Sequence, residues 1–239
     1  MEKRETKVRV QNLTKKFGDL LVLHDLNFEV AAGEFLCIVG PTGCGKTTFL
    51  NSLTRLYEPT AGDILVDGIP VDPKKQNISY IFQEYSAFPW LTVEQNVRFG
   101  LDIKKVPKAE ADVNVDEMLE IVGLDQFRDY YPSQLSISML SRVAIARAFA
   151  TKPELLLMDE PYGQLDIDLR FKLEDELIKL WKRTGTTVLF ITHNIEEAVY
   201  LSEKIMVLTN KPTSVKTVID NPLPRPRDVV SQEFVELRN

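Results

Sequence analysis

Residues 40–48 are the part of the chain best suited to binding a phosphate group. They follow a mostly apolar run, residues 34–39, and precede residues 49–53, an order typical of strand, glycine loop and helix. In such a loop, glycines let successive backbone N–H groups converge on a phosphate, and the helix points its positive end at the same anion. The stretch fits the pattern G-x-x-x-x-G-K-S/T and consists of Gly40, Pro41, Thr42, Gly43, Cys44, Gly45, Lys46, Thr47 and Thr48.

Two side chains of this loop have the chemistry that a bound polyphosphate requires. Lys46 would reach the β- and γ-phosphates, and the hydroxyl of Thr47 would ligate Mg²⁺. The alternative is a glycine-rich turn that fits the pattern by chance, which average residue usage allows in roughly 1% of chains of this length. The flanking strand and helix reduce that figure further, so we predict a true phosphate site.

A second candidate feature is the acidic end of a buried strand. Residues 155–158 are four apolar residues, and Asp159 and Glu160 follow them directly. The carboxylate of Asp159 can hold the hydration shell of Mg²⁺, and Glu160 could polarise a water for attack on the γ-phosphate. Alone, an apolar strand that ends in acids is more often structural, so its significance depends on the phosphate loop in the same chain.

Three further residues are candidates because of their positions at strand ends. Gln83 follows a predicted strand, and an amide there can bond both Mg²⁺ and the attacking water. His193 follows another and can reach a γ-phosphate, although a loop histidine with a purely structural role is the alternative. Phe17 precedes the turn of a predicted hairpin, where it could stack on an adenine or be an ordinary core or edge aromatic.

Composition limits the kinds of partner. The chain has 239 residues, 44% hydrophobic and 27% charged, which suits one large domain or one domain with an inserted lobe. A net charge of −6 without a dense Lys/Arg block argues against nucleic acid. Cys37 and Cys44 lie where a mutual disulfide would distort strand and loop, which indicates a reducing compartment. No apolar leader or membrane-spanning run exists, so we expect any membrane role to be peripheral.

The apolar pattern predicts an α/β core with an inserted helical lobe. We predict strands over residues 8–17, 20–30, 34–39, 63–66, 77–82, 155–158, 186–192, 204–209 and 214–220. We predict helices over residues 45–56, 93–99, 108–122, 139–149, 166–183, 195–201 and 231–238. The helix over 108–122 should bury Val113, Met118, Leu119 and Val122. In the lobe, residues 85–91 are unusually apolar for a loop, which fits either a partner surface or a plain lobe core.

Taken together, these motifs resemble the Walker A, Q-loop, Walker B, D-loop and H-loop of the ABC transporter ATPases, in order and over nearly the whole chain. The matching positions are Gly40 to Thr48, Gln83, residues 155–161, Asp166 and His193. Residues 88–97 and 223–228 look like the nitrate/sulfonate/taurine importer branch. The resemblance implies a P-loop NTPase (RecA-like) core with an antiparallel β subdomain and an inserted α-helical subdomain. The core would comprise residues 1–83 and 151–220, the helical subdomain 84–150, and a C-terminal tail 221–239.

The family implies a complex and a set of roles. The chain would be a peripheral ATPase subunit on the cytoplasmic side of the cell membrane, bound to integral membrane permease subunits and only indirectly to a solute-binding protein. It would bind ATP and Mg²⁺ as a head-to-tail homodimer, or as a heterodimer with a second ABC ATPase. The loop after Gln83 would meet the permease's coupling helix. The implied roles are adenine stacking for Phe17, phosphate and Mg²⁺ binding for Lys46 and Thr47, Mg²⁺ support for Asp159 and Gln83, general base for Glu160, and γ-phosphate contact for His193.

The sequence departs from the family at its signature motif. Leu-Ser-Gly-Gly-Gln appears here as residues 135–139, with Ile137 and Ser138 in place of the glycines. Ile137 would crowd the approach of backbone N–H groups to a phosphate, and Ser138 adds atoms there, whereas Ser136 can still bond a phosphate oxygen. Because this motif acts in trans, a homodimer would have two impaired sites and a heterodimer with a normal partner would keep one good site.

Three functions remain open. The first is an ATP-hydrolysing subunit of an importer for a nitrate/sulfonate/taurine-type small solute. The second is a regulatory subunit that binds ATP but hydrolyses it poorly. The third, a soluble ABC protein of translation or DNA repair, is disfavoured because it would want paired cassettes or a basic surface.

Overall fold

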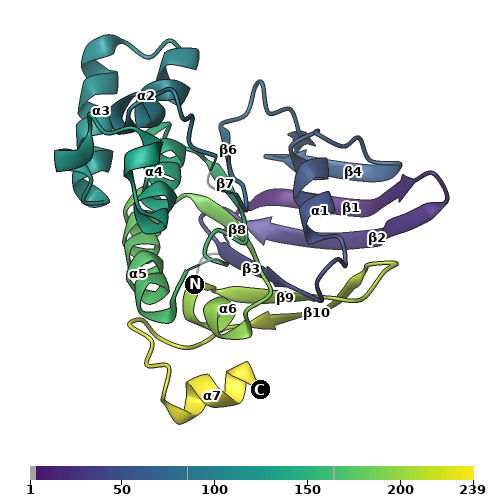
Figure 1. The fold of residues 1–239 in the computed structure, drawn as a ribbon. Helices are drawn as coiled ribbons and strands as arrows, with labels where there is room; N and C mark the ends of the chain where they lie inside the picture. Colours follow the sequence, from purple (N-terminus) through teal and green to yellow (C-terminus); the bar gives the residue numbers. More distant parts are fainter. Residues whose placement is uncertain (1–3, 85, 164) are drawn as a thin grey trace. The chain divides into compact units, whose positions relative to one another are not determined.

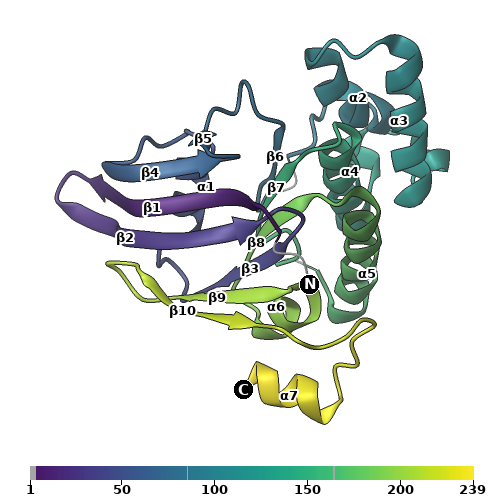
Figure 2. The same cartoon turned by 180° about the vertical axis from the view of Figure 1, so that it is seen from behind.

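The computed structural model describes residues 4–84, 86–163 and 165–239, which form two compact units. The first unit contains the described residues up to 76 together with residues 187–239, and the second contains those between 77 and 186. Figures 1 and 2 follow the chain from two opposite sides. Each unit has strands and helices of its own.

The first unit contains an antiparallel sheet with the strand order β2-β1-β4-β5. Its strands are β1 (Thr6–Phe17), β2 (Leu20–Ala31), β4 (Ala61–Val66) and β5 (Ile69–Pro70). Apolar residues that alternate along β1, among them Val8 and Val10, are buried, which is the pattern of a sheet with one face on a core. The predicted hairpin around Gly18 is therefore confirmed.

A second set of strands in the first unit is mostly parallel. Its elements are β3 (Phe35–Val39), β8 (Thr187–Thr192), β9 (Lys204–Leu208) and β10 (Val215–Asp220), with α1 (Lys46–Leu53), α6 (Ile195–Leu201) and α7 (Gln232–Arg238). β3 lies between β8 and β9 and is parallel to both, and β10 is antiparallel to β9. Every residue of β3 and β8 is buried. Because Val39 pairs with Thr192, the residues that follow these two strands emerge at the same edge.

The second unit combines a parallel strand pair with helices. Its elements are β6 (Ile78–Ile81), β7 (Leu155–Asp159), α2 (Val93–Ile103), α3 (Lys108–Ile121), α4 (Ile137–Ala150) and α5 (Ile167–Thr184), with short 3-10 turns at Asp125–Phe127 and Pro132–Gln134. β6 pairs with β7 in parallel, with Ile81 opposite Met158. α2 packs against both α3 and α4. The prediction that helices occupy the chain between these two strands is therefore confirmed.

Four details differ from the predictions. α1 ends at Leu53, and α2 continues to Ile103 instead of ending at residue 99. α4 begins two residues before the predicted Met139, because the hydroxyl of Ser136 accepts a hydrogen bond from its backbone N–H and caps the helix. The prediction that Val113 is buried is wrong: it is 64% exposed. The buried side of α3 runs through Ala111, Asn114, Val115, Met118 and Leu119.

Several simpler expectations concern single residues and spans. Cys37 and Cys44 are both buried and are not joined by a disulfide. His24, the second histidine of the chain, is exposed on β2. Within the described ranges, no helix combines the length and apolar composition needed to cross a bilayer.

The start of α2 provides a stability test. The hydroxyl of Thr92 accepts from the N–H of Gln95, and the Gln95 side chain accepts from the N–H of Thr92 at 2.9 Å. We expect Thr92→Ala to lower the free energy of unfolding by about 1 kcal/mol, since the cap is lost. Thr92→Ser, which keeps the hydroxyl, should stay within about 0.5 kcal/mol of the parent in urea unfolding. Equal losses in both variants would contradict a capping role.

Candidate functional site

The predicted phosphate loop connects β3 to α1 in the first unit. It turns through Gly43 and Gly45, which have φ angles of +74° and +121°. A Cβ at Gly45 would lie 2.9 Å from Cγ1 of Val22 and 3.1 Å from Cδ2 of Leu23, so the hairpin strand β2 leaves room for glycine alone. The loop therefore has the strained, tightly supported backbone that close approach of main-chain N–H groups to an anion requires.

Lys46 lies inside this loop although it is charged. The residue is only 5% exposed. Its ammonium donates hydrogen bonds to the carbonyl oxygens of Gly40 at 2.9 Å and Pro41 at 3.2 Å. Gly45 is the N-cap of α1 and has no side chain that could accept hydrogen bonds from the first N–H groups of this helix. Thr47 is exposed and Thr48 half-buried at the same helix start. An ammonium, a helix N-terminus and a hydroxyl thus gather at one place.

A residue that the sequence did not single out supports the loop from the far end of the chain. Thr213 is fully buried, and its hydroxyl donates to the carbonyl oxygen of Cys44. Its backbone is fixed to β2, because its N–H donates to Val22 at 2.9 Å and its carbonyl accepts from His24 at 2.8 Å. A lone threonine 169 positions from its partner gives no local signal, so only the fold reveals it.

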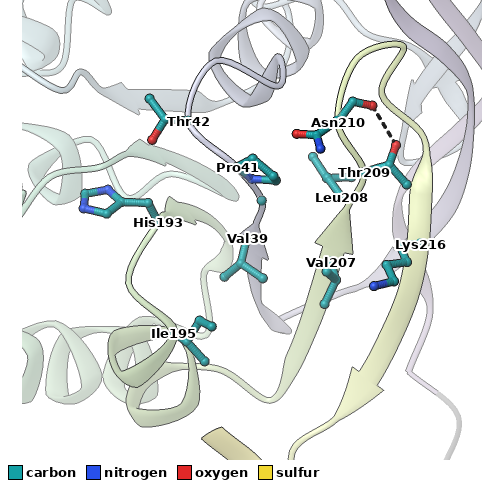
Figure 3. A pocket seen from close by; sticks show the side chains of 11 residues that line it. Val39, Pro41, Thr42, His193, Ile195, Val207, Leu208, Thr209, Asn210 and Lys216 are labelled. Carbon is teal, nitrogen blue, oxygen red and sulfur yellow. Dashed lines mark hydrogen bonds between the residues drawn. The ribbon is translucent and has the colours of Figure 1, made fainter. Parts of the chain in front are cut away.

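His193 shares a hollow with the phosphate loop. β8 ends at Thr192, whose hydroxyl accepts from the N–H of Asn194, and Asn194 in turn caps α6. His193 is exposed between them. The hollow has a volume of about 690 Å³, and Figure 3 shows Thr42 and His193 on one side of Pro41 and the connection between β9 and β10 on the other. Its lining includes Val39, Gly40, Pro41, Thr42, His193 and Asn210.

In the second unit, Gln83 and Asp159 lie at the ends of neighbouring parallel strands. Asp159 ends β7, is 3% exposed, and accepts a hydrogen bond from the hydroxyl of Tyr80 at 3.3 Å. Gln83 follows β6 by two residues and is exposed. Since carboxyl ends of parallel strands meet at one edge, the amide and the carboxylate belong to the same edge of this pair. Tyr80 is a supporting residue that the sequence interpretation missed.

Glu160 has an unusual backbone for its residue type. Its φ is +46°, in the left-handed region that non-glycine residues rarely occupy. Its carbonyl accepts from the N–H of Gly163 at 3.2 Å, which closes a turn directly after β7. The side chain is half-buried. Such a conformation costs of order 1–3 kcal/mol and is found mainly where a site needs a side chain aimed in one direction.

The degenerate signature forms the start of α4. Ser136 is the N-cap: its hydroxyl accepts from the N–H of Met139 at 3.3 Å and lies 3.0 Å from the hydroxyl of Ser138. Ile137 is 51% exposed. The apolar side chain therefore projects from the helix start, beside the only hydroxyl that the motif retains at its usual position.

Phe17 lies at the end of β1 and is half-open. Its ring meets Tyr57 edge-on at 5.3 Å between centroids, and the ammonium of Lys15 lies 4.8 Å from its centroid. The residue is 42% exposed.

An aromatic patch, defined here as Phe88, Trp90, Phe99 and Ile103, lies on the second unit. The ring of Phe88 lies 4.4 Å from Phe99 and 5.6 Å from Trp90, and Trp90 is 70% exposed. It adjoins a hollow of about 400 Å³ lined in part by Phe88, Phe99 and Ile103. Half-buried Phe88 and exposed Trp90 combine the two predictions for this loop, a lobe core and a partner surface. Tyr85, the first residue of that loop, lies outside the described residues.

Two polar residues, Asn96 and the half-buried Arg147, hold the patch in shape. Asn96 is fully buried and its side chain bonds the N–H of Phe88 and the carbonyls of Phe88 and Leu91. Arg147 of α4 donates to the carbonyl and hydroxyl of Ser86 at 2.7 and 2.8 Å and lies over the Phe88 ring. Burial lowers the pKa of Arg147. The loop after Gln83 is therefore tied to the helix that starts with the signature.

Each unit thus carries its own part of the predicted site. The first holds Phe17, the phosphate loop and His193, and the structure brings the last two together. The second holds Gln83, Asp159, Glu160 and Ser136, and it brings Gln83 and Asp159 to adjacent strand ends.

Comparison with known proteins gives one consistent result. The family model described as ABC transporter matches residues 23–163. An uncharacterized ABC transporter ATP-binding protein of Methanocaldococcus jannaschii is 44% identical, covering 99% of this chain and 90% of its own. The aliphatic sulfonates import ATP-binding protein SsuB of Bacillus anthracis is 42% identical, covering 94% of this chain and 88% of its own.

Solved structures agree. The structure of cbiO1 from Clostridium perfringens, part of the ABC transporter complex cbiONQ, has a TM-score of 0.82 and 26% identity, covering 91% of this chain and 90% of its own. A dimeric ATP-binding cassette in a post-hydrolysis state with ADP and Pi has a TM-score of 0.79 and 32% identity, covering 91% of this chain and all of its own.

The Thr213 contact leads to a prediction about the loop. Thr213→Val removes the hydroxyl but keeps the shape, so the carbonyl of Cys44 loses its donor and the loop loses a restraint. A buried group left unpaired costs about 1–3 kcal/mol, so we expect affinity for a fluorescent ATP analogue to fall about tenfold. Thr213→Ser keeps the donor and should bind within about twofold of the parent. Unchanged affinity in Thr213→Val would show that the contact does not shape the phosphate loop.

Proposed function

The chain belongs to the ABC transporter family of ATP-binding proteins, and from this premise we propose that it hydrolyses ATP to energise a membrane importer for a small solute of the nitrate/sulfonate/taurine type. The ATP-binding assignment rests chiefly on one observation, the buried Lys46 ammonium held by two carbonyls of a glycine loop in which a Cβ at Gly45 would crowd Val22. When a nucleotide binds, its phosphate oxygens compensate the positive charge of an ammonium enclosed in this way.

The phosphate loop fits a nucleoside triphosphate. Gly43 and Gly45 provide the backbone curvature, Lys46 the charge and α1 the helix N-terminus. Phe17 is 42% exposed, and we assign adenine stacking to its ring. His193, in the hollow beside Thr42, would contact the γ-phosphate.

Magnesium would be held by few protein atoms. No group of three or more His, Cys, Asp or Glu side chains that could hold a metal occurs among the described residues. In nucleotide sites Mg²⁺ keeps several waters and binds substrate phosphates with one or two protein ligands. We assign those ligands to Thr47, with Asp159 and Gln83 supporting the hydration shell. The ion would supply charge neutralisation at the phosphates.

Glu160 is the general base in this proposal. It lies directly after Asp159 in a left-handed backbone conformation, and a half-buried carboxylate can accept a proton from water. Gln83 would orient that water through its amide. Proton acceptance by Glu160 is the step that the chain itself contributes to hydrolysis.

The signature supports a heteromeric arrangement. Ile137 and Ser138 replace glycines at the start of α4, and the exposed Ile137 side chain would oppose a phosphate of the partner's nucleotide. A second ABC ATPase with glycines there would complete the site built on this chain's phosphate loop. The alternative, favoured by the same two residues, is a regulatory subunit that binds ATP and turns it over poorly.

The importer assignment rests on the sulfonate-import relatives and on the aromatic patch. Trp90 is too exposed for a core residue, and the patch is held rigidly by Asn96 and Arg147. We propose that a coupling helix of an integral permease subunit docks there, with the chain peripheral on the cytoplasmic side of the membrane. A solute-binding protein would act on the permease and not on this chain.

Phosphate release tests the catalytic assignment. We expect little release from ATP by the purified chain alone, and a clear increase in the double variant Ile137→Gly/Ser138→Gly, because partner signatures are then intact. Adding Glu160→Gln should lower that rate by on the order of 100-fold or more while ATP binding persists, since general-base catalysis contributes about that much. If the glycines restore no release while ATP still binds, the regulatory alternative stands and the enzymatic one fails.

The docking surface is tested by capture of membrane protein. Trp90→Ala should reduce recovery of an integral permease from detergent-solubilised source membranes by about tenfold, because aromatic anchors at interfaces are worth about 2 kcal/mol or more. Tyr130→Ala is the matched control, an aromatic 42% exposed on the same unit but outside the patch. Nucleotide binding should be unchanged in both variants. Equal recovery by Trp90→Ala and the parent would place the permease contact elsewhere.

A further inference from the structure

Residues 223–228, the Leu-Pro-Arg-Pro-Arg-Asp segment of the tail, have a contact that the proposed function does not use. In Figures 1 and 2 the tail connects β10 to α7 on the side of the first unit that carries α6. Two arginines of this segment, Arg225 and Arg227, are turned toward the C-terminal end of α6 and donate to its last carbonyl groups.

The hydrogen bonds cover the whole end of the helix. Arg227 donates to the carbonyls of Val199 at 2.7 Å and Tyr200 at 2.9 Å. Arg225 donates to those of Tyr200 at 3.2 Å and Leu201 at 2.5 Å. The side-chain amide of Asn221 adds a bond to Val199 at 2.8 Å. Ser202 bonds Ala198 at 2.7 Å, so each of the last four carbonyls of α6 accepts from a side chain.

These contacts matter because α6 is short. It has seven residues, and helices of that length do not hold together without tertiary support. Two guanidinium groups at its C-terminus satisfy carbonyls that have no partner within the helix and complement the negative end of its dipole. Arg227 also donates to the carbonyl of Leu223, so the segment folds back on itself around the same guanidinium.

The arrangement is costly, which argues that it is selected for a purpose. Arg227 is 9% exposed, and burial, with a smaller contribution from the charge of Arg225, lowers its pKa to about 10. Helix α7 follows directly, and its Phe234 is fully buried. Phe234 and Arg227 both line one hollow. The tail is therefore anchored by α7 as well as by Arg225 and Arg227, which we call the arginine clamp.

The N-terminal end of α6 adjoins His193, the residue proposed to contact the γ-phosphate. The side chain of Asn194 accepts from the N–H groups of Glu196 and Glu197, at 3.0 and 3.3 Å, and His193 is the next residue back. β8 fixes the chain on the other side of His193. The direction of the histidine is therefore set by two supports, the buried strand before it and the short helix after it.

We propose that Arg225 and Arg227 are positioning residues for His193, acting through α6, which they hold from its far end. This rests on the proposed function, in which His193 contacts the γ-phosphate. Loosening the clamp would let α6 shift and fray, and the histidine would lose its defined place beside Thr42 without any change in the phosphate loop itself. The tail segment is thus part of the nucleotide site although it touches no nucleotide.

The chain contains only two histidines, which makes the proposal directly observable. With ¹³C-labelled histidine, the imidazole signals of His193 and His24 are assigned by a His193→Gln variant. Arg227→Lys keeps the positive charge but loses the planar fork. We expect its His193 signal to shift or broaden while that of His24, exposed on β2, stays in place. Arg9→Lys, which alters a surface ion pair with Glu29 in the same unit, should move neither signal.

Kinetics give the second readout. In the Ile137→Gly/Ser138→Gly background, adding Arg227→Lys should lower kcat about tenfold with KM for ATP within about twofold, because displacement of a catalytic contact by about 1 Å can cost on the order of 100-fold. Arg225→Lys should give a smaller effect of the same kind, and it supplies the test if Arg227→Lys does not fold. An unchanged His193 signal in a folded variant overturns the proposal, whatever happens to the melting temperature.

Different results would contradict the proposed ATPase function and the positioning role of Arg225 and Arg227. If the parent's His193 signal does not respond to ATP, or the Ile137→Gly/Ser138→Gly variant does not hydrolyse ATP, the proposed function fails. The clamp still stands if Arg227→Lys moves the His193 signal. If the parent responds to ATP and the variant responds identically, the function stands and the clamp fails.

Discussion

The site depends first on the parallel pairing of β3 with β8. Both strands are fully buried, and their register sets Val39 opposite Thr192, so the phosphate loop and His193 leave the sheet at the same edge. Neither element could be moved by a residue without turning buried side chains to the other face. Parallel pairing therefore converts two sequence motifs about 150 residues apart into one hollow, and the helices that follow each strand only have to hold what the strands have aligned.

Local chemistry accounts for what the sequence predicted well. The glycine loop, the capped helix starts at Thr92, Asp166, Asn194 and Ser231, and the continuous apolar strands β7 and β8 are all specified by residues within a few positions of one another. The periodic pattern failed at Val113, because one apolar residue on a helix does not say which side its neighbours cover. The predicted start of α4 was wrong by two residues, since a cap such as Ser136 sets a helix end by a single hydrogen bond.

The supports of the site were out of reach of the sequence. Thr213 holds the phosphate loop, Tyr80 holds Asp159, and Arg147 holds the loop after Gln83, and in each case the partner lies tens of positions or more away. A threonine or an arginine in a loop has many possible partners, so its type alone carries no information about the one it finds. Residues that bind a ligand repeat a family pattern, whereas residues that orient them are chosen by the packing of one fold.

This difference bears on the degenerate signature. The motif lost its glycines, yet the helix behind it is well formed, with Ser136 as its cap and Arg147 anchored below. The phosphate loop has its positive-φ glycines and its enclosed lysine, and Glu160 has a left-handed backbone directly after β7. The two features are held by different contacts, because the phosphate loop is supported by β2 and Thr213, whereas the signature is supported at the start of α4. Ile137 and Ser138 can therefore replace the signature glycines without disturbing the phosphate loop of the same chain.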